Sequence, residues 1–349
     1  VTMGMMRRFG RFSAGHVVAA VTITLLALAV LPAGTAAQAT PVDTCQSISE
    51  PGEYRLAGTL SGNGSTPCLR ITASDVALDG QGNAVVGNDS DAVGVLVEPT
   101  GNDTLTNVTV SNLTTTGWKI GLTYRGGVAT GSVRNVTAAA NRDGIVIDPK
   151  LRFQAASDTV ELIDNRAVDN ERWGGALRPG ADADRVIGTT LRNNEIGVVA
   201  ADVRTLSMAD TRATNNTWGV VIGDATATTL RNTTVRENAQ DGLRAGNGFD
   251  DGRLLDTTAR ANGGAGLRLG PANNATLRNA TATDNGESGL ALRDAADVRA
   301  TALVVTDNEG WGLDFDGVSD ALLVDVTTGR NAAGFYTATD SGNVTIRLN

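Results

Sequence analysis

The chain is poor in the side chains that most metal proteins and many enzymes use for chemistry. Its 349 residues include one histidine, two cysteines and four methionines. The histidine, His16, lies near the N-terminus, and the only methionine past Ala39 is Met208. Copper is held by imidazole, thiolate or thioether ligands, so the sequence predicts no copper site and no resident cofactor.

Patterns typical of helices are also missing. Aromatic residues make up 4% of the chain and there are 8 prolines. No apolar stripe with a 3.6-residue period is long enough for a helix. The stretch from Leu277 to Leu292 instead shows two short apolar strands joined by an Asn-Gly turn. These features exclude the helical repeat folds and favour short strands.

Lysine is nearly absent, and acidic residues exceed basic ones. The chain has 29 basic and 38 acidic side chains, and only two lysines, Lys119 and Lys150. Residues 1–39 hold three arginines and no acid, so the remainder carries 29 − 3 = 26 basic groups and a net charge of 26 − 38 = −12. No run of basic residues offers the track that phosphates require, which predicts no nucleic-acid partner. An acidic, lysine-poor composition is typical of halophilic proteins.

A glycine followed by an apolar-x-apolar triplet recurs along the chain. The eleven positions are Gly94, Gly121, Gly144, Gly174, Gly197, Gly219, Gly242, Gly266, Gly289, Gly312 and Gly334. Subtracting neighbours gives steps of 27, 23, 30, 23, 22, 23, 24, 23, 23 and 22 residues. A fixed period of this size indicates a solenoid. We predict an all-β, single-domain parallel β-helix of about eleven rungs of 22–24 residues, with its repeats over residues 81–349.

The N-terminal part has the features of an export signal followed by a cap. Three arginines precede an apolar run from Val17 to Leu31, and Ala37-Gln38-Ala39 offers a small-residue cleavage site. We therefore interpret residues 1–39 as a signal peptide and the protein as secreted or at the cell surface. Cys45 and Cys68 follow directly, and an even pair in an exported chain predicts a disulfide. Residues 40–80 would then cap the first rung.

An asparagine precedes most of the repeat glycines by four residues. The column is Asn170, Asn193, Asn215, Asn238, Asn262, Asn285 and Asn308, with Asn331 one place out of register. Asparagine tolerates the left-handed backbone of a tight turn, and stacked amides can hydrogen-bond from rung to rung. The column predicts a structural asparagine ladder. The four tryptophans, just before repeat glycines, are interpreted as core or turn packing.

The segment from Cys45 to Gly80 reads CQSISEPGEYRLAGTLSGNGSTPCLRITASDVALDG. Together with the repeats it resembles the right-handed parallel β-helix proteins of the NosD type, within the pectin-lyase-like superfamily. That resemblance implies the fold and its right hand. The superfamily contains polysaccharide lyases, hydrolases, epimerases and non-catalytic proteins, so the activity stays open. The Gly-His-Gly element of the hydrolases is absent, and at Asp148-Pro149-Lys150 only the first two residues match the Asp-Pro-His-Asp element of alginate epimerases.

A charged column follows the first repeat glycines at the fourth position. It contains Glu98, Arg125, Asp148 and Arg178, which would stack at about 4.8 Å per rung. The two longest steps insert residues directly after Glu98 and Asp148, and insertions gathered on one face often mark a binding face. The second insertion adds two more cations to this ligand-binding set, Lys150 and Arg152. The alternative is a salt-bridged ladder beside two tolerated loops.

These patterns favour a secreted, non-catalytic module that contacts extracellular polysaccharide or glycan. One alternative is a Ca²⁺-assisted lyase of uronate polymers, with Arg125, Asp148 and Arg178 as catalytic candidates. Another is a purely structural surface protein. Val344, Ile346 and Leu348 alternate as in a half-buried strand, which predicts end-to-end self-association or pairing with another surface protein.

Overall fold

The structure is a computed structural model that describes residues 38–101, 103–149, 159–181, 184–246 and 248–349. Residues Gln38–Asn349 form one compact unit. Residues 1–37 of the predicted signal peptide, Lys150 and Arg152 lie outside the described residues. The described part contains 34 strands. It contains no helix long and apolar enough to cross a membrane.

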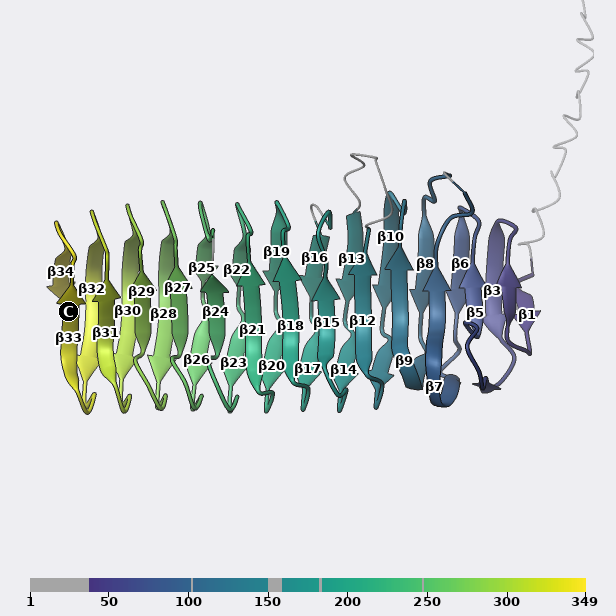
Figure 1. Ribbon diagram of the computed structural model, residues 1–349, viewed down its shortest axis with the longest axis horizontal. Coiled ribbons are helices and arrows are strands. Elements are labelled where there is room, and N and C mark those ends of the chain that lie inside the picture. Colours follow the sequence, from purple (N-terminus) through teal and green to yellow (C-terminus); the bar gives the residue numbers. More distant parts are fainter. Residues whose placement is uncertain (1–37, 102, 150–158, 182–183, 247) are drawn as a thin grey trace, which may run out of the picture. The chain divides into compact units, whose positions relative to one another are not determined.

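The strands form three parallel sheets that run the length of the unit, as Figure 1 shows. Each turn of the chain visits sheet 3, sheet 1 and sheet 2 in that order. Five long strands bend around a corner and belong to two sheets: β7 and β9 join sheets 1 and 2, and β28, β30 and β32 join sheets 3 and 1.

Sheet 1 contains β4 (Leu60–Ser61), β7 (Ala84–Val97), β9 (Thr114–Arg125), β11 (Thr137–Ala139), β14 (Arg166–Val168), β17 (Thr190–Arg192), β20 (Arg212–Thr214), β23 (Thr234–Arg236) and β26 (Thr258–Arg260). Sheet 2 contains β2 (Gln46–Ile48), β5 (Leu69–Ile71), the ends of β7 and β9, β12 (Asp143–Asp148), β15 (Trp173–Leu177), β18 (Ile196–Ala201), β21 (Trp218–Gly223), β24 (Leu243–Gly246), β27 (Leu267–Gly270), β29 (Leu290–Arg293), β31 (Trp311–Asp316) and β33 (Gly334–Thr339). Sheet 3 contains β1 (Thr40–Val42), β3 (Gly52–Leu56), β6 (Val76–Asp79), β8 (Val108–Ser111), β10 (Thr130–Arg134), β13 (Thr159–Ile163), β16 (Asp184–Ile187), β19 (Leu206–Ala209), β22 (Thr229–Arg231), β25 (Arg253–Leu255), β28 (Thr276–Thr283), β30 (Arg299–Thr306), β32 (Leu322–Gly329) and β34 (Thr345–Leu348).

The predicted fold is confirmed: the chain is a right-handed parallel β-helix of about thirteen turns. The sequence predicted about eleven rungs. The additional turns come before Gly94, where β2 and β5 belong to sheet 2 but carry no glycine to mark the repeat. The interior is filled by Val, Leu, Ile and Ala, with the larger side chains of Tyr124, Phe249 and Phe315 fully buried.

An asparagine ladder runs inside the corner between sheets 1 and 2, but two of its members differ from the prediction. It contains Asn141, Asn170, Asn194, Asn216, Asn238, Asn262, Asn285, Asn308 and Asn331. The predicted Asn193 and Asn215 are instead exposed turn residues with φ of 57° and 56°. The corner is one residue shorter in those rungs, so counting back four places from glycine selected the wrong neighbour. Asn331, predicted to be out of register, is a full member.

Each ladder asparagine satisfies its whole amide. In Asn216 the Oδ1 atom accepts hydrogen bonds from the backbone N–H of Asn194 at 2.9 Å and from its Nδ2 at 3.0 Å. The Nδ2 atom of Asn216 donates to the carbonyl of Leu191 at 3.2 Å and to Oδ1 of Asn238 at 3.1 Å. A side-chain amide has two donors and an acceptor oxygen with two lone pairs, so all of the hydrogen-bonding groups of this amide are used.

The ladder explains the glycine column. A Cβ atom on each of the nine glycines from Gly121 to Gly312 would lie between 2.6 and 3.1 Å from Nδ2 of a ladder asparagine. At Gly242, for example, the distance to Nδ2 of Asn262 would be 2.6 Å. Contacts this short require backbone movement in a close-packed interior. The same Cβ atoms would also lie no more than 2.9 Å from a backbone carbonyl oxygen of the next rung, so the glycine repeat reflects both the ladder and the close approach of neighbouring rungs.

Aspartates occupy many of the outer corners. Fifteen aspartates in the described part have φ between 47° and 63°, a conformation that Asp and Asn adopt more readily than other non-glycine residues. Several accept a hydrogen bond from an asparagine one rung on, as in the pairs Asn232–Asp210 and Asn279–Asp256. Turn geometry thus accounts for a large part of the acidic composition.

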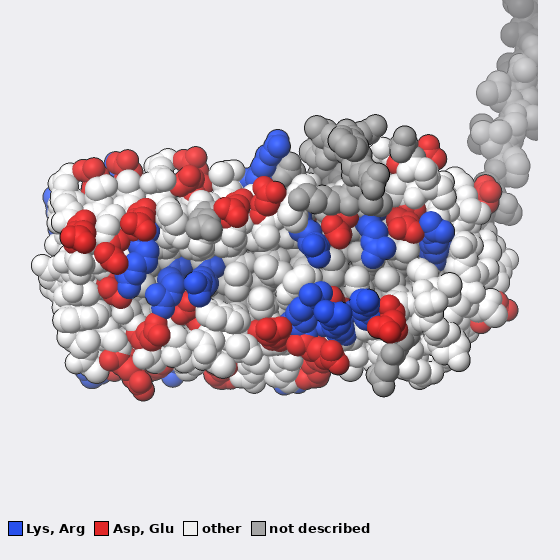
Figure 2. All heavy atoms as spheres, in the orientation of Figure 1, with Lys and Arg blue, Asp and Glu red and all other residues white. Residues whose placement is uncertain are grey.

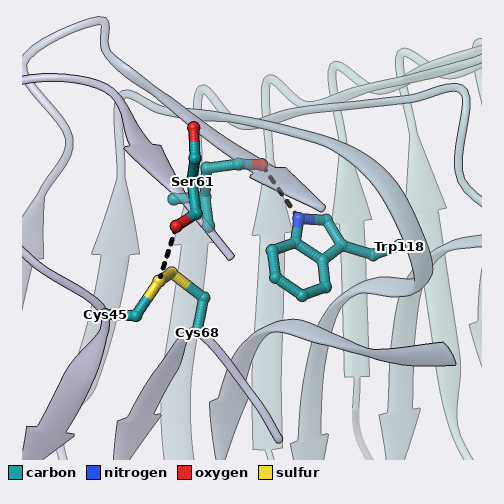
Figure 3. Close-up of a disulfide and its surroundings, with 5 residues drawn as sticks. Cys45, Ser61, Cys68 and Trp118 are labelled. Atoms are coloured by element: carbon teal, nitrogen blue, oxygen red, sulfur yellow. Dashed lines mark hydrogen bonds between the residues drawn. A yellow bond between two sulfur atoms is a disulfide. The ribbon is translucent and has the colours of Figure 1, made fainter. Parts of the chain in front are cut away.

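The predicted disulfide is present at the N-terminal end of the unit (Figure 3). Cys45 and Cys68 are bonded across a separation of 23 residues. Trp118 lies beside them and donates from its indole nitrogen to the carbonyl of Val85 at 2.9 Å. A Cβ atom on Gly62 would lie 2.7 Å from the indole and 3.3 Å from Sγ of Cys45, so this loop is packed between the ring and the disulfide.

At the other end, β34 pairs with β32 of sheet 3. Val344 and Ile346 pack partly against the core, while Leu348 is 56% exposed and Tyr336 of β33 is 49% exposed. The predicted pairing of this strand with another copy or partner remains a prediction.

We expect Asn216→Ala to destabilise the fold by at least about 3 kcal/mol, because it leaves several buried polar groups without partners at about 1–3 kcal/mol each. Asn215→Gly is the matched control, since residue 215 is exposed and glycine accepts its positive φ. Its free energy of unfolding should stay within about 0.5 kcal/mol of the wild type. Urea titration of both variants measures this, and equal losses would show that the assignment of the ladder is wrong.

Replacement of Cys45 and Cys68 by serine should lower the melting temperature, since closing a loop of this length stabilises by roughly 3 kcal/mol. The loss should be local, because each rung of a solenoid contacts only its neighbours. Hydrogen exchange should show faster opening over residues 45–75 with little change beyond residue 200. Uniform opening along the unit would contradict a capping role.

Candidate functional site

The candidate site lies on the outer face of sheet 2, where strand alternation turns every second side chain away from the core. In β9, Leu122 and Tyr124 point inward and are fully buried, while Arg125 follows at the outer edge of the face. The hydroxyl of Tyr124 donates to the carbonyls of Val108 and Ser132, and burial raises the pKa of Tyr124 far above its ordinary value. The site thus rests on an uncharged, rigid floor.

The predicted charged column forms as the spacing indicated. Asp148 stands opposite Arg125 in the register of β12 and β9, and Glu98 and Arg178 follow strand residues that are paired in the same way. Asp148 Oδ2 lies 3.7 Å from Nε of Arg178. Glu98 Oε2 lies 4.0 Å from the Arg125 guanidinium. The four side chains therefore alternate in charge on four successive rungs.

Arg70, in β5, contacts this column without having been predicted, although in the strand register it stands opposite Leu96. Its guanidinium lies 2.9 Å from Oε1 of Glu98, so Glu98 is held between two arginines. Arg70 is preceded by Cys68 and Leu69 rather than by a repeat glycine, and the glycine pattern therefore could not find it. A hollow of about 430 Å³ opens here, and Arg70, Glu98, Arg125 and Lys119 are among the residues that line it.

The opposite edge of the same face carries a second ion pair. Nε of Arg172 donates to Oδ1 of Asp143 at 2.7 Å, and this hydrogen bond raises the pKa of Arg172. The guanidinium of Arg172 stacks 3.6 Å from the ring centroid of Trp173, and that of Arg178 lies 5.8 Å from the same ring. Trp173 thus connects the second ion pair with the charged column.

The sequence predicted core or turn packing for the four tryptophans, and Trp118 packs in the core with 2% exposure. Trp173, Trp218 and Trp311 are half-buried on the outer face of sheet 2. The sequence argument placed the residue before glycine on the inner side, but the chain turns at that residue and the strand alternation begins only after it.

A second hollow of about 430 Å³ lies further along the same face, and the sequence argument missed it. Its floor is a glycine stripe, where Gly223, Gly246 and Gly270 are paired in register. Its lining includes Arg244, Arg268 and Arg293. These glycines occupy the fourth position after the repeat glycines, so continuing the predicted column along the chain would have revealed it. Figure 2 shows two groups of basic side chains on this face, separated by an uncharged stretch.

The arginines of the second hollow are mostly held by acids. Nε of Arg268 donates to Asp241 at 2.8 Å, and Arg293 contacts Asp314 at 2.5 Å. Burial alone would lower the pKa of Arg268, but its hydrogen bond to Asp241 and the charges of Asp241 and Glu287 raise it. Among residues 38–349 that are described, no three His, Cys, Asp or Glu side chains are grouped as metal ligands.

Comparison with known proteins agrees with the fold. A family model described as "Right handed beta helix region" matches residues 218–349. No curated protein sequence matches the chain.

Solved structures with the same fold are distant in sequence. The A-module of mannuronan C-5 epimerase AlgE6 from Azotobacter vinelandii superposes with a TM-score of 0.52 and 15% identity, over 89% of this chain and 91% of that one. A mutant of the periplasmic alginate epimerase AlgG gives a TM-score of 0.51 and 13% identity, over 78% of this chain and 77% of that one. Tailspike protein 3 of bacteriophage CBA120 gives a TM-score of 0.52 and 12% identity, over 85% of this chain and 54% of that one. At these identities the likeness concerns the fold alone.

Proposed function

We propose that the Gln38–Asn349 unit is a polysaccharide-binding module, and that a sugar chain contacts the outer face of sheet 2 at Glu98, Arg125, Asp148 and Arg178. The observation that carries this proposal is the alternation of guanidinium and carboxylate groups on successive rungs, beside a hollow of about 430 Å³.

The chemistry of the column suits a sugar chain. Sugar hydroxyls both donate and accept hydrogen bonds, and here guanidinium donors and carboxylate acceptors stand about 4.8 Å apart along the sheet. Ion pairing holds the arginines and acids in place before a ligand arrives, which reduces the entropy lost on binding. An arginine can also hold the carboxylate of a uronate in a bidentate pair. We therefore expect acidic polysaccharides to bind more tightly than neutral ones.

The structural neighbours support this ligand class. Two of them are named as epimerases that act on alginate or mannuronan. The disulfide between Cys45 and Cys68 fits an oxidising compartment outside the cytosol, in keeping with the predicted signal peptide. We accordingly place the protein outside the cell or at its surface.

The same column supports a second candidate, a Ca²⁺-assisted uronate lyase. Its basis is that Glu98 and Asp148 lie on the two rungs that flank Arg125. In this alternative the carboxylates would hold the ion and an arginine would take the proton next to the uronate carboxyl. We favour binding without turnover, because Arg125 and Arg178 each lie within 4.0 Å of a carboxylate, so both guanidinium groups and both acids are already engaged with one another.

Titration with a panel of uronate polymers tests the proposal. The double variant Arg125→Gln, Arg178→Gln should lower the affinity at least tenfold, since hydrogen bonds to charged groups contribute about 1.5–3 kcal/mol each. The matched control is Arg134→Gln, Arg185→Gln, which removes two arginines that pair with Glu161 on sheet 3. The control should stay within about twofold of the wild type.

Two other results of this titration would indicate a different function. An unsaturated uronate product that requires Ca²⁺ and disappears in the Arg125 and Arg178 variants would establish the lyase. No binding to any polymer in the panel would contradict the proposal and leave a purely structural surface protein.

A further inference from the structure

A stripe of arginines lies on the outer face of sheet 3, away from the candidate site. Its members are Arg231 in β22, Arg253 in β25, Arg278 in β28 and Arg299 in β30, one on each of four successive rungs. All four are exposed. Successive members are 21 to 25 residues apart in the sequence, so they do not appear there as a cluster of basic residues. We call these four residues the arginine stripe.

The register of the strands sets the geometry of the stripe. Arg253 and Arg299 occupy one column, with Thr276 between them, and Arg231 and Arg278 occupy the next column, with Leu255 between them. The stripe is therefore a zigzag with one positive charge per rung, or about one per 4.8 Å along the sheet.

None of the four guanidinium groups forms an ion pair or a side-chain hydrogen bond with any residue that the structure describes. This differs from sheet 3 nearer the N-terminus, where Arg134 and Arg185 both pair with Glu161. The outward strand residues beside the stripe are Thr229, Leu255, Thr276 and Thr301, and none is acidic.

Acids sit in the turns that border the stripe, and three of them have other partners. Asp210, Asp251 and Asp256 accept hydrogen bonds from the asparagine amides of the following rung. The stripe therefore concentrates positive charge on a protein whose net charge is −9. Four like charges within about two Debye lengths repel one another, and an anion laid along the stripe would relieve that repulsion.

We propose that the arginine stripe binds a linear uronate polysaccharide, with the chain running across the strands and its carboxylates on successive rungs. A 1,4-linked uronate chain carries one carboxylate per sugar ring, and its repeat is close to the rung spacing. Successive carboxylates can therefore face successive arginines. Thr276 between Arg253 and Arg299, with Thr229 and Thr301 at the ends of the two columns, offers hydroxyls to the sugar hydroxyls.

The surroundings of the stripe favour a sugar chain over nucleic acid. On sheet 3, the outward strand positions beside the stripe carry no aromatic ring on which a base could stack. The stripe is two columns wide and bordered on both sides by turn aspartates such as Asp251 and Asp256, which would repel the broad phosphate surface of a duplex. A single polysaccharide chain fits between them.

This face is separate from the candidate site on sheet 2, and the inference does not rest on the function proposed for that site. Oligogalacturonates of two to eight sugars, titrated at several salt concentrations, are the probe. In a protein that already carries Arg125→Gln and Arg178→Gln, so that the sheet 2 site is removed, we expect Arg253→Gln, Arg278→Gln to lower the affinity about tenfold and to reduce the dependence of log K on log salt concentration by about one per arginine. The wild-type affinity should rise with chain length up to about four sugars, the length of the stripe.

The matched control is Arg236→Gln, Arg260→Gln, which removes two arginines of sheet 1 that pair with Glu237 and Asp284. It makes the same change in net charge and should alter the affinity less than twofold. Equal effects of the two double variants would overturn the inference, as would an absence of wild-type binding. So would a single-stranded oligonucleotide that binds as tightly as the octasaccharide and depends on the same arginines.

Amide exchange with the octasaccharide separates this inference from the proposed function. Protection over β22, β25, β28 and β30 supports the stripe. Protection confined to β9, β12 and β15 would overturn the stripe and support the sheet 2 site. Protection confined to sheet 3 would support the stripe and overturn the sheet 2 site.

Discussion

The asparagine ladder is the interaction on which the rest of the structure depends. Its amides satisfy the backbone of the corner between sheets 1 and 2 from Trp118 to Asn331, and they lie so close to sheet 2 that only glycine fits beside them. This contact repeats on successive rungs and sets where each strand of sheet 2 begins. Residues a fixed number of places after the glycine are therefore stacked, and the stacking of Arg125, Asp148 and Arg178 in the charged column is a consequence.

The corner geometry also separates the charges. Left-handed turn positions select aspartate and asparagine, whereas the flat outer faces of the sheets accept threonine and arginine. As a result, the acidic net charge belongs mainly to the edges of the coil, and its faces carry most of the cations. Two of these faces, on sheets 2 and 3, present arginines in step with the rungs, which suits a regularly repeating anionic polymer better than a compact ligand.

Much of this was predictable from the sequence, because a solenoid converts spacing directly into contact. The glycine period predicted the fold and the stacking of Glu98 with Arg125. It failed where rungs change length: the shorter corners moved the ladder to Asn194 and Asn216. It also could not reveal Arg70, which has no repeat glycine before it, or the arginine stripe, whose alternate columns appear only once the strands of sheet 3 are paired.

A double-mutant cycle on Gly242 and Asn262 tests most directly whether the ladder dictates the glycine column. Gly242→Ala should destabilise the wild type, because the new methyl group would meet the Asn262 amide. In an Asn262→Ala background the contact with the amide is absent, while those with the Gly266 carbonyl and Val235 remain. The same substitution should therefore cost less but not nothing, with a coupling free energy of about 1 kcal/mol. Equal costs in both backgrounds would contradict the account.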